Sequence, residues 1–490
     1  MRCFLMLLSL FSVCLLLSGC DALEESEEKQ GGVINPQVID HQGGRVTPPP
    51  RDLIREMLLS APEGEWPEPL PVLTWFENLD EGWREVESEG RPMLVLVRCP
   101  VSNASGSLDQ ELLSPPPGLA EILRQFVTVV ITDGQRVDLN RLPMNSHQDP
   151  DQTWWLWILS PQGQVYSVLG EKNRGTVSLS TDDLVAWMTE VLNHHWDPRR
   201  LDWKADGEPV DPTTPPLSIT ENPAYEMWKA GAEHMGTLRK EQQCMCCHQV
   251  QDTFWSEIKL TTQFLPHIHY VIWPPEENVG FILQDDHRIA LQEVMPDSFA
   301  SKTSLQAQDR IGVITNKRVF SGTDLRVQLH TYEGRSGRTI YAVRGGDYLD
   351  TSLSLQTGNW RRYDLSWRKS IYESVISSHP GFIPQEVNEG TKSKLGLSGK
   401  LALKPLVGKA SPAWAAGIRP DQIIYEYVED TTEMTPYQFL FNFKMTAPVG
   451  AKRFLSVGPA DGKGPGRKVN IPALSIFDVP QEAFSMFEEK

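Results

Sequence analysis

The sequence predicts an α+β protein made of several domains. Its 490 residues are enough for three or four domains of ordinary size. Residues 70–195 alternate helix-like and strand-like patterns, as expected for one sheet covered by helices. Residues 275–475 contain a repeated pattern of strands and short helices. These two observations together define the fold class, and each segment is justified below in chain order.

The start of the chain has the pattern of an export signal. Arg2 supplies a positive charge, and the apolar run over residues 4–17 is short for a membrane span. The run ends in Leu-Ser-Gly-Cys20, which resembles the lipobox of bacterial lipoproteins. That resemblance implies removal of residues 1–19 and a lipid on Cys20. We therefore expect a protein anchored to a membrane of the bacterial cell envelope and facing the periplasm. An ordinary secretory signal with an accidental cysteine is the alternative.

Charge and cysteine content restrict the partners and the chemistry. The net charge of −18 argues against nucleic acid and against an anionic membrane surface. Of seven cysteines, three lie in or at the end of the signal, which leaves Cys99, Cys244, Cys246 and Cys247. These four are too few and too clustered for a disulfide framework. They indicate cofactor binding or redox chemistry.

The next segments are a tether and a first globular domain. Residues 20–69 are acidic, then glycine-rich and proline-rich, and we expect a tether with one short helix over 51–59. The globular segment has helix patterns and buried strands in alternation. The expected helices are 75–89, 119–125 and 181–192, and the expected strands are 92–97, 126–132, 154–159 and 164–169. This order resembles that of thioredoxin-like proteins and covers residues 70–195.

Cys99 lies where that family carries its nucleophilic cysteine, after a buried strand and near a helix start. Backbone N–H groups and the helix dipole at such a position lower the pKa of a thiol. Ser102 replaces the second cysteine of the family motif, so Cys99 is limited to monothiol chemistry. Thr153 or a neighbour stands where the family has a cis-proline. The domain is therefore either a thiol-dependent oxidoreductase or a structural thioredoxin-like fold.

The segment 218–274 contains the spacing of c-type haem attachment. Cys244 and Cys247 could form thioethers to the haem vinyl groups, and His248 would be the proximal iron ligand. A helix pattern over 224–240 leads into the motif, as in cytochromes c. The segment is small, at about 55 residues, and offers no clear sixth ligand. A site without a cofactor, or a zinc or thiol site that includes His248 and the unexplained Cys246, remains open.

The C-terminal part contains an internal repeat. Ser298-Phe-Ala300 recurs as Ser411-Pro-Ala413, and each is followed by an Asp-x-Ile strand start. The pattern resembles bacterial PDZ domains, which implies two PDZ-like β-barrels over residues 275–355 and 388–475. The candidate loops for a peptide carboxylate are Val279, Gly280, Phe281 and Ile282 in the first copy and Leu395, Gly396, Leu397 and Ser398 in the second. Peptide binding by β-addition is the functional interpretation, and a purely structural role is the alternative.

The order lipobox, thioredoxin-like domain, CxxCH and tandem PDZ resembles the thioredoxin/PDZ-domain (seleno)protein family over most of residues 70–475. Some members carry selenocysteine at a redox position, whereas this chain has only cysteine. The sequence lacks a serine-protease elbow such as Gly-x-Ser-x-Gly, so a protease is not expected. Two functions follow: an envelope redox or electron-transfer protein that binds partner proteins or peptide C-termini, or a non-catalytic scaffold or sensor without haem.

Overall fold

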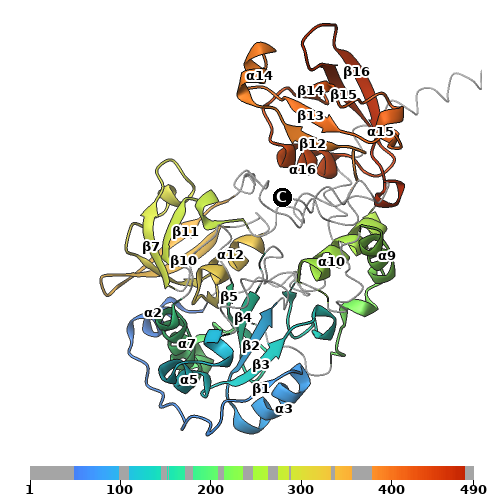
Figure 1. Cartoon of the computed structure of the whole chain (residues 1–490). Coiled ribbons are helices and arrows are strands. Elements are labelled where there is room, and N and C mark those ends of the chain that lie inside the picture. The colour runs from blue at the N-terminus through green and yellow to red at the C-terminus, as the bar shows by residue number, and fades with distance from the viewer. Residues whose placement is uncertain are drawn as a thin grey trace, which may run out of the picture. The chain divides into compact units, whose positions relative to one another are not determined.

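The computed structural model describes residues 49–98, 110–144, 152, 154–170, 180–207, 214–235, 245, 247–262, 274–285, 288–332, 337–355 and 378–479. Within these ranges the protein is a mixed α/β structure with three sheets (Figure 1). The α+β prediction is confirmed at this level. Among the described residues, no helix is both long enough and apolar enough to cross a bilayer.

The first sheet has five strands in the order β1-β3-β2-β4-β5. The strands are β1 (Trp75–Phe76), β2 (Met93–Arg98), β3 (Val127–Ile131), β4 (Trp154–Leu159) and β5 (Val165–Gly170). Strands β1, β2 and β3 are mutually parallel, and β4 and β5 run antiparallel to their neighbours. Four of these strands were predicted to within about a residue. The prediction of a helix starting at residue 75 is wrong, because 75 and 76 pair with β3.

Helix α3 (Leu79–Glu89) begins after that short strand, where Asn78 caps it by accepting the Asp80 N–H at 2.8 Å. It ends at Gly90 in the left-handed region, with φ of 67°. The other predicted helices are present as α2 (Arg51–Leu59), α5 (Pro117–Leu123) and α7 (Thr181–Trp196). A short helix, α8 (Arg200–Trp203), follows α7.

The two faces of the first sheet belong to different core clusters. Leu94 and Leu96 face α5 and α7, whereas Val95 and Val97 belong to the cluster that includes α3. That second cluster also contains Trp228 and Met245 from around α9 (Tyr225–Met235) and α10 (Cys247–Thr262). Each such buried side chain contributes about 1.5–3 kcal/mol. The α9–α10 segment therefore shares its core with the first sheet instead of building its own.

The second sheet orders its strands β11-β10-β8-β7-β6, with β9 paired to β8. The strands are β6 (Phe281–Asp285), β7 (Arg288–Val294), β8 (Arg310–Ile314), β9 (Lys317–Arg318), β10 (Arg338–Arg344) and β11 (Asp347–Leu353). Helix α12 (Gly322–His330) packs Leu325 and Leu329 into its core. The 3-10 turns η3 (Glu276–Asn278) and η4 (Ala300–Lys302) flank β6 and β8 in the chain.

The third sheet orders its strands β12-β13-β14-β15-β16. The elements are β12 (Ile383–Glu386), α14 (Glu389–Lys394), β13 (Leu403–Leu406), α15 (Pro412–Ala415), β14 (Gln422–Tyr427), α16 (Pro436–Thr446), β15 (Lys452–Pro459), β16 (Arg467–Pro472) and η6 (Ile476–Asp478). Both the second and the third sheet are open, so the prediction of closed barrels is wrong. Closure requires pairing of the two terminal strands. Here the helices α12 and α16 cover the core instead, through residues such as Leu325 and Phe439.

The second sheet's helix α12 is fastened to the free edge of β5. The Asp324 carboxylate accepts the Ser167 hydroxyl at 2.7 Å and the Val168 N–H at 2.9 Å. In return, the Ser321 hydroxyl donates to the Val168 carbonyl at 2.6 Å. These bonds satisfy edge groups that would otherwise be open to another strand. The first and second sheets are therefore joined by buried polar contacts as well as by the chain.

Candidate functional site

Several predicted site residues lie outside the described part of the chain. These are Cys20, Cys99, Ser102 and Cys244, together with Cys246 and Thr153. Cys247 and His248 open α10, and only their backbone is described. Among the described residues, no group of three or more His, Cys, Asp and Glu side chains is arranged to hold a metal ion. The site is therefore built from the residues that surround the cysteines.

Met245, which stands between two of the cysteines, is held by the first sheet. Its side chain belongs to the core, and the residue is 2% exposed. Its N–H donates to Asp133 Oδ1 at 2.8 Å, and its carbonyl accepts the Gly134 N–H at 2.8 Å. A Cβ at Gly134 would lie 2.9 Å from the Met245 carbonyl oxygen, so only glycine allows this approach without a shift. The cysteine motif is thus attached to residues 133–134.

These two residues follow the carboxyl end of β3. Strand β3 is parallel to β2, with Val97 opposite Ile131, so both strands end at the same edge of the sheet. Arg98 is the last residue of β2, and Cys99 follows it directly in the sequence. The two cysteine-bearing segments therefore attach to neighbouring strand ends, although 145 positions separate Cys99 from Cys244 in the chain (244 − 99).

Helix α10 is unusually rich in buried polar residues. Gln249, Gln251, Asp252, Thr253 and Ser256 are all buried. The hydroxyls of Thr253 and Ser256 donate to carbonyls four residues earlier, at 2.9 and 2.7 Å. Asp252 Oδ2 accepts the indole N–H of Trp228 at 3.0 Å, which ties α9 to α10. Gln251 Oε1 is buried and has no hydrogen-bond partner within the described part of the chain.

The acceptor groups of Gln251 and Asp252 lie near the predicted iron ligand His248 in the helix sequence. Positions 251 and 252 follow position 248 by three and four residues and so share its face of α10. A metal-ligating imidazole commonly donates its second N–H to such an acceptor. Two thiols and an imidazole in this spacing fit covalent haem c. The same donor types also fit zinc.

The first predicted peptide loop, residues 279–282, packs tightly on the repeated Ser-x-Ala segment. Gly280 has φ of 99°, and a Cβ there would lie 2.0 Å from Ser298 Oγ. The Ala300 N–H donates to the Val279 carbonyl at 2.7 Å. The N–H groups of Val279 and Gly280 donate to the carbonyls of η3, and Phe281 and Ile282 pair with β7.

The second predicted loop, residues 395–398, has a different local role. Gly396 stands in the left-handed region, with φ of 68°, just after α14. The Leu397 N–H donates to the Lys392 carbonyl at 2.8 Å, and the Gly396 N–H donates to the Ser393 carbonyl at 3.1 Å. This pair of bonds is the Schellman motif that ends a helix. These amides are engaged in the helix cap.

The structure gives the first loop another counterpart, residues 380–383. Gly381 has φ of 79°, and a Cβ there would lie 3.0 Å from Ser411 Oγ and 3.1 Å from Ala413 Cβ. The Ser411 hydroxyl donates to the Gly381 carbonyl. By local geometry, residues 380–383 are therefore the counterpart of 279–282, and peptide binding at 395–398 stays a prediction. The sequence held this signal, because Gly-Phe-Ile occurs at both 280–282 and 381–383.

A buried polar network was not found by sequence reasoning. Asp206 binds His194 Nε2 at 2.6 Å and Arg200 Nη1 at 2.8 Å. The Lys317 ammonium donates to the Asp206 carbonyl, and burial lowers the pKa of Lys317 to about 8. Burial also lowers the pKa of His195 to about 4. The network holds α7, α8 and β9 together, and no sequence spacing connects its members.

Comparison of the chain with protein-family models and with curated proteins finds no match. The functional conclusion therefore rests on the residues and contacts of this chain.

Proposed function

We propose that the protein is a lipid-anchored redox protein of the bacterial cell envelope, with PDZ-like modules that bind peptide C-termini. In this proposal the first sheet is thioredoxin-like, and its carboxyl edge carries the redox centre. The strand order β1-β3-β2-β4-β5, with antiparallel β4 and β5, supports that assignment. The export signal and lipidation of Cys20 supply the compartment.

The observation that carries the proposal is the attachment of Met245 to Asp133 and Gly134. A structural linker has no need to bring a cysteine cluster to the edge where the thioredoxin-like family places its reactive thiol. The partly buried N–H···carboxylate bond at 2.8 Å fixes this segment against the strand end. A redox centre requires such a fixed position, because electron or thiol transfer depends on short and constant distances.

Haem c at Cys244 and Cys247, with His248 as iron ligand, would supply one-electron transfer. The chain contributes the covalent anchor, the buried acceptors of α10 and shelter from the first sheet. Residues 218–274 are few for an independent haem domain. The first sheet compensates for this, because Trp228 and Met245 are buried in a core that α9 and α10 could not build alone. Cys99 would act beside this centre as a single reactive thiol.

Peptide binding is the second part of the proposal. Strands β6 and β12 are the terminal strands of their sheets, and each begins within a Gly-Phe-Ile segment, at Phe281 and at Ile383. A terminal strand beside a loop with inward backbone amides accepts a peptide by strand addition. We assign this role to residues 279–282 and 380–383. The non-catalytic scaffold is the alternative and would use the same two edges.

The decisive experiment is expression with cytochrome c maturation proteins, followed by a pyridine haemochrome spectrum and intact mass. We expect one covalent haem in the wild type and none in Cys247→Ala. The matched control is Cys246→Ala, which preserves the CxxCH spacing and should retain haem. A colourless wild type that binds zinc through Cys246 would replace haem by a metal-thiolate site, and a colourless protein that only binds peptides would favour the scaffold.

Peptide binding is tested with fluorescent peptides that end in a free or an amidated carboxyl group. We expect Ile383→Ala to weaken binding of the free-carboxyl peptide. Gly396→Ala is the control, because a Cβ there meets nothing within 4 Å and position 396 belongs to the helix cap. If Gly396→Ala binds the peptide more weakly and Ile383→Ala does not, residues 395–398 would be the carboxylate-binding loop.

A further inference from the structure

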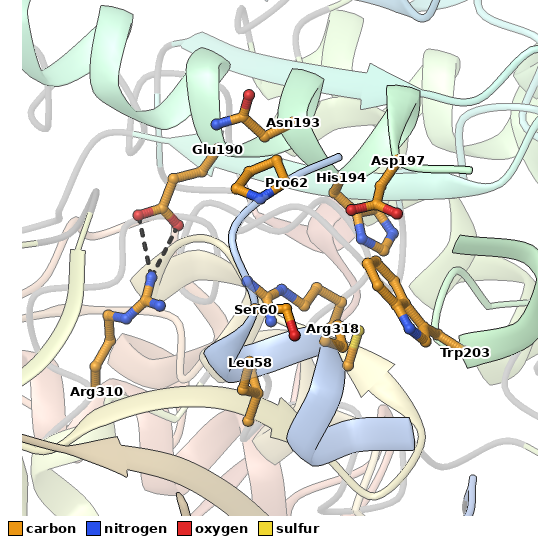
Figure 2. A pocket seen from close by; sticks show the side chains of 11 residues that line it. Leu58, Ser60, Pro62, Glu190, Asn193, His194, Asp197, Trp203, Arg310 and Arg318 are labelled. Carbon is orange, nitrogen blue, oxygen red and sulfur yellow. Dashed lines mark hydrogen bonds and ion pairs between the residues drawn. The ribbon is translucent and has the colours of Figure 1, made fainter. Parts of the chain in front are cut away.

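A cavity of about 190 Å³ lies between α2, α7, α8 and the strands β8 and β9 (Figure 2). This volume is below that of sites for drug-sized ligands and suits a ligand of a few heavy atoms. Leu58, Pro62 and Trp203 provide apolar surface, and Asn193 and Ser60 provide polar groups. None of the lining residues belongs to either Gly-Phe-Ile loop.

The acidic groups of the cavity already have partners. Glu190 accepts from Arg310 Nη1 at 3.1 and 3.3 Å, and Figure 2 shows this ion pair at one end of the cavity. Asp197 is bound by Arg199 through Nε at 2.9 Å and Nη2 at 2.6 Å. His194, also at the wall, is engaged by Asp206, and burial lowers its pKa, so it is neutral at pH 7.

Arg318 also lines this cavity, and Glu190 attracts it without forming an ion pair. Its Nε and Nη1 atoms are buried, and neither has a hydrogen-bond acceptor among the residues that the structure describes. Its Cζ lies 5.3 Å from the centre of the Phe320 ring. Burial, with added repulsion from Arg310, lowers the pKa of Arg318 to about 10, so the guanidinium stays charged at pH 7. A buried charge of this kind is costly unless an anion pairs with it.

We propose that this cavity binds a small organic carboxylate, whose oxygens are bound by Arg318 and whose hydrocarbon part contacts Leu58 and Trp203. A guanidinium donates charge-assisted hydrogen bonds to a carboxylate. A dianion such as phosphate is disfavoured, because the carboxylates of Glu190 and Asp197 also line the site. The apolar walls further favour a ligand that has a hydrocarbon part.

Binding there would fasten three separate parts of the chain. Leu58 belongs to α2, Asn193 to α7 and Arg318 to β9. A ligand that bridges them should slow the opening of α2, which packs on its neighbours through residues such as Ile54 and Met57. The ligand is therefore expected to protect α2 amides from hydrogen exchange.

The test is a calorimetric titration of the full chain with sodium butyrate at constant ionic strength, together with hydrogen exchange of residues 51–59. We expect saturable binding with Kd in the millimolar range, roughly 1–10 mM, and slower exchange of α2. Arg318→Met should weaken butyrate binding at least tenfold. Arg310→Gln removes the same unit charge from the cavity but should weaken binding less.

Three results would overturn the proposal. The first is the absence of saturable butyrate binding by the wild type up to about 50 mM, well above the expected Kd. The second is an equal loss in Arg318→Met and Arg310→Gln, which would indicate attraction by charge alone. The third is tighter binding of inorganic phosphate than of butyrate, which would assign the cavity to a different class of anion. Because the wild-type titration decides the first result, the proposal stays testable if a variant fails to fold.

Discussion

Replacing Asp133 by alanine tests whether the first sheet holds the cysteine motif in place. The Asp133 carboxylate accepts the Met245 N–H at 2.8 Å and the Gln135 N–H at 3.0 Å. In Asp133→Ala the Met245 amide loses its acceptor while its residue remains buried. We therefore expect the segment around Met245 to open more easily than in the wild type.

The magnitude follows from the type of bond. A hydrogen bond to a charged acceptor contributes about 1.5–3 kcal/mol, and a buried donor left unpaired costs a similar amount. The second bond of Met245, from the Gly134 N–H to its carbonyl, remains and limits the loss to that range. The corresponding change is roughly 10- to 150-fold in the opening equilibrium.

The assay is hydrogen exchange with mass spectrometry on peptides that cover residues 245–256. Exchange there should be faster in Asp133→Ala by the stated factor. The matched control is Asp138→Ala, because Asp138 Oδ1 accepts the N–H groups of Asn140 and Leu217 at 3.0 and 3.1 Å. That control should loosen the segment around Leu217 and leave 245–256 unchanged. Equal exchange of 245–256 in both variants would refute the reasoning.

Three further predictions concern the rest of the fold. Gly280→Ala should lower the free energy of unfolding by roughly 2–5 kcal/mol, because its Cβ would lie 2.0 Å from Ser298 Oγ and its φ is positive. Gly346→Ala also has a positive φ, of 95°, but open space around it, and should cost about 1–2 kcal/mol. Equal losses of hydrogen-exchange protection in the strands next to the two positions would contradict this. His195 has a pKa lowered to about 4, so the unfolded chain binds its proton first as pH falls below about 6.5, and stability should drop by roughly 3 kcal/mol between pH 6.5 and 4; urea unfolding checks this, and an equally steep slope in His195→Gln, where the buried His194 and His379 remain, would be the contrary result. Asp324→Ala leaves buried donors unpaired and should lower the free energy of unfolding by about 3–5 kcal/mol. Hydrogen exchange should become faster in both β5 and α12. Faster exchange in α12 alone would show that the two sheets are not coupled there.

The elements that sequence reasoning found are those with a local signal. Strand β2 is a continuous apolar run, buried on both faces, and such runs stand out in any window. Strand β1 was missed because Trp75 and Phe76 form only two residues of strand beside a helix pattern. Their strand character comes from pairing with Thr128 and Val129, about fifty positions away in the chain (128 − 75 = 53). Long-range pairing of this kind has no local signature.

The second peptide loop shows how one local pattern can have two meanings. A glycine between two leucines suits a loop that presents amides to a ligand, and it equally suits the end of a helix. Lys392 and Ser393 decide between them, because their carbonyls accept the amides of residues 396 and 397. The recurrence of Gly-Phe-Ile, compared across both copies, would have given 380–383 instead.

The polar centres depend on partners that only the fold brings together. Lys317 reaches the Asp206 carbonyl across 111 positions, and Asp324 reaches Ser167 across 157. The sequence separation of Met245 from Asp133 is 112 positions. No periodicity links such residues, so the attachment of the CxxCH segment to the first sheet could not be derived before the structure.

The central claim is that the cysteine motif at the edge of the first sheet is a covalent haem site. The most direct measurement is the intact mass and pyridine haemochrome spectrum of the protein made with cytochrome c maturation proteins. The account predicts one haem per chain, retained in Cys246→Ala and lost in Cys247→Ala. A protein without haem, made beside a cytochrome c that matures normally in the same cells, would contradict it.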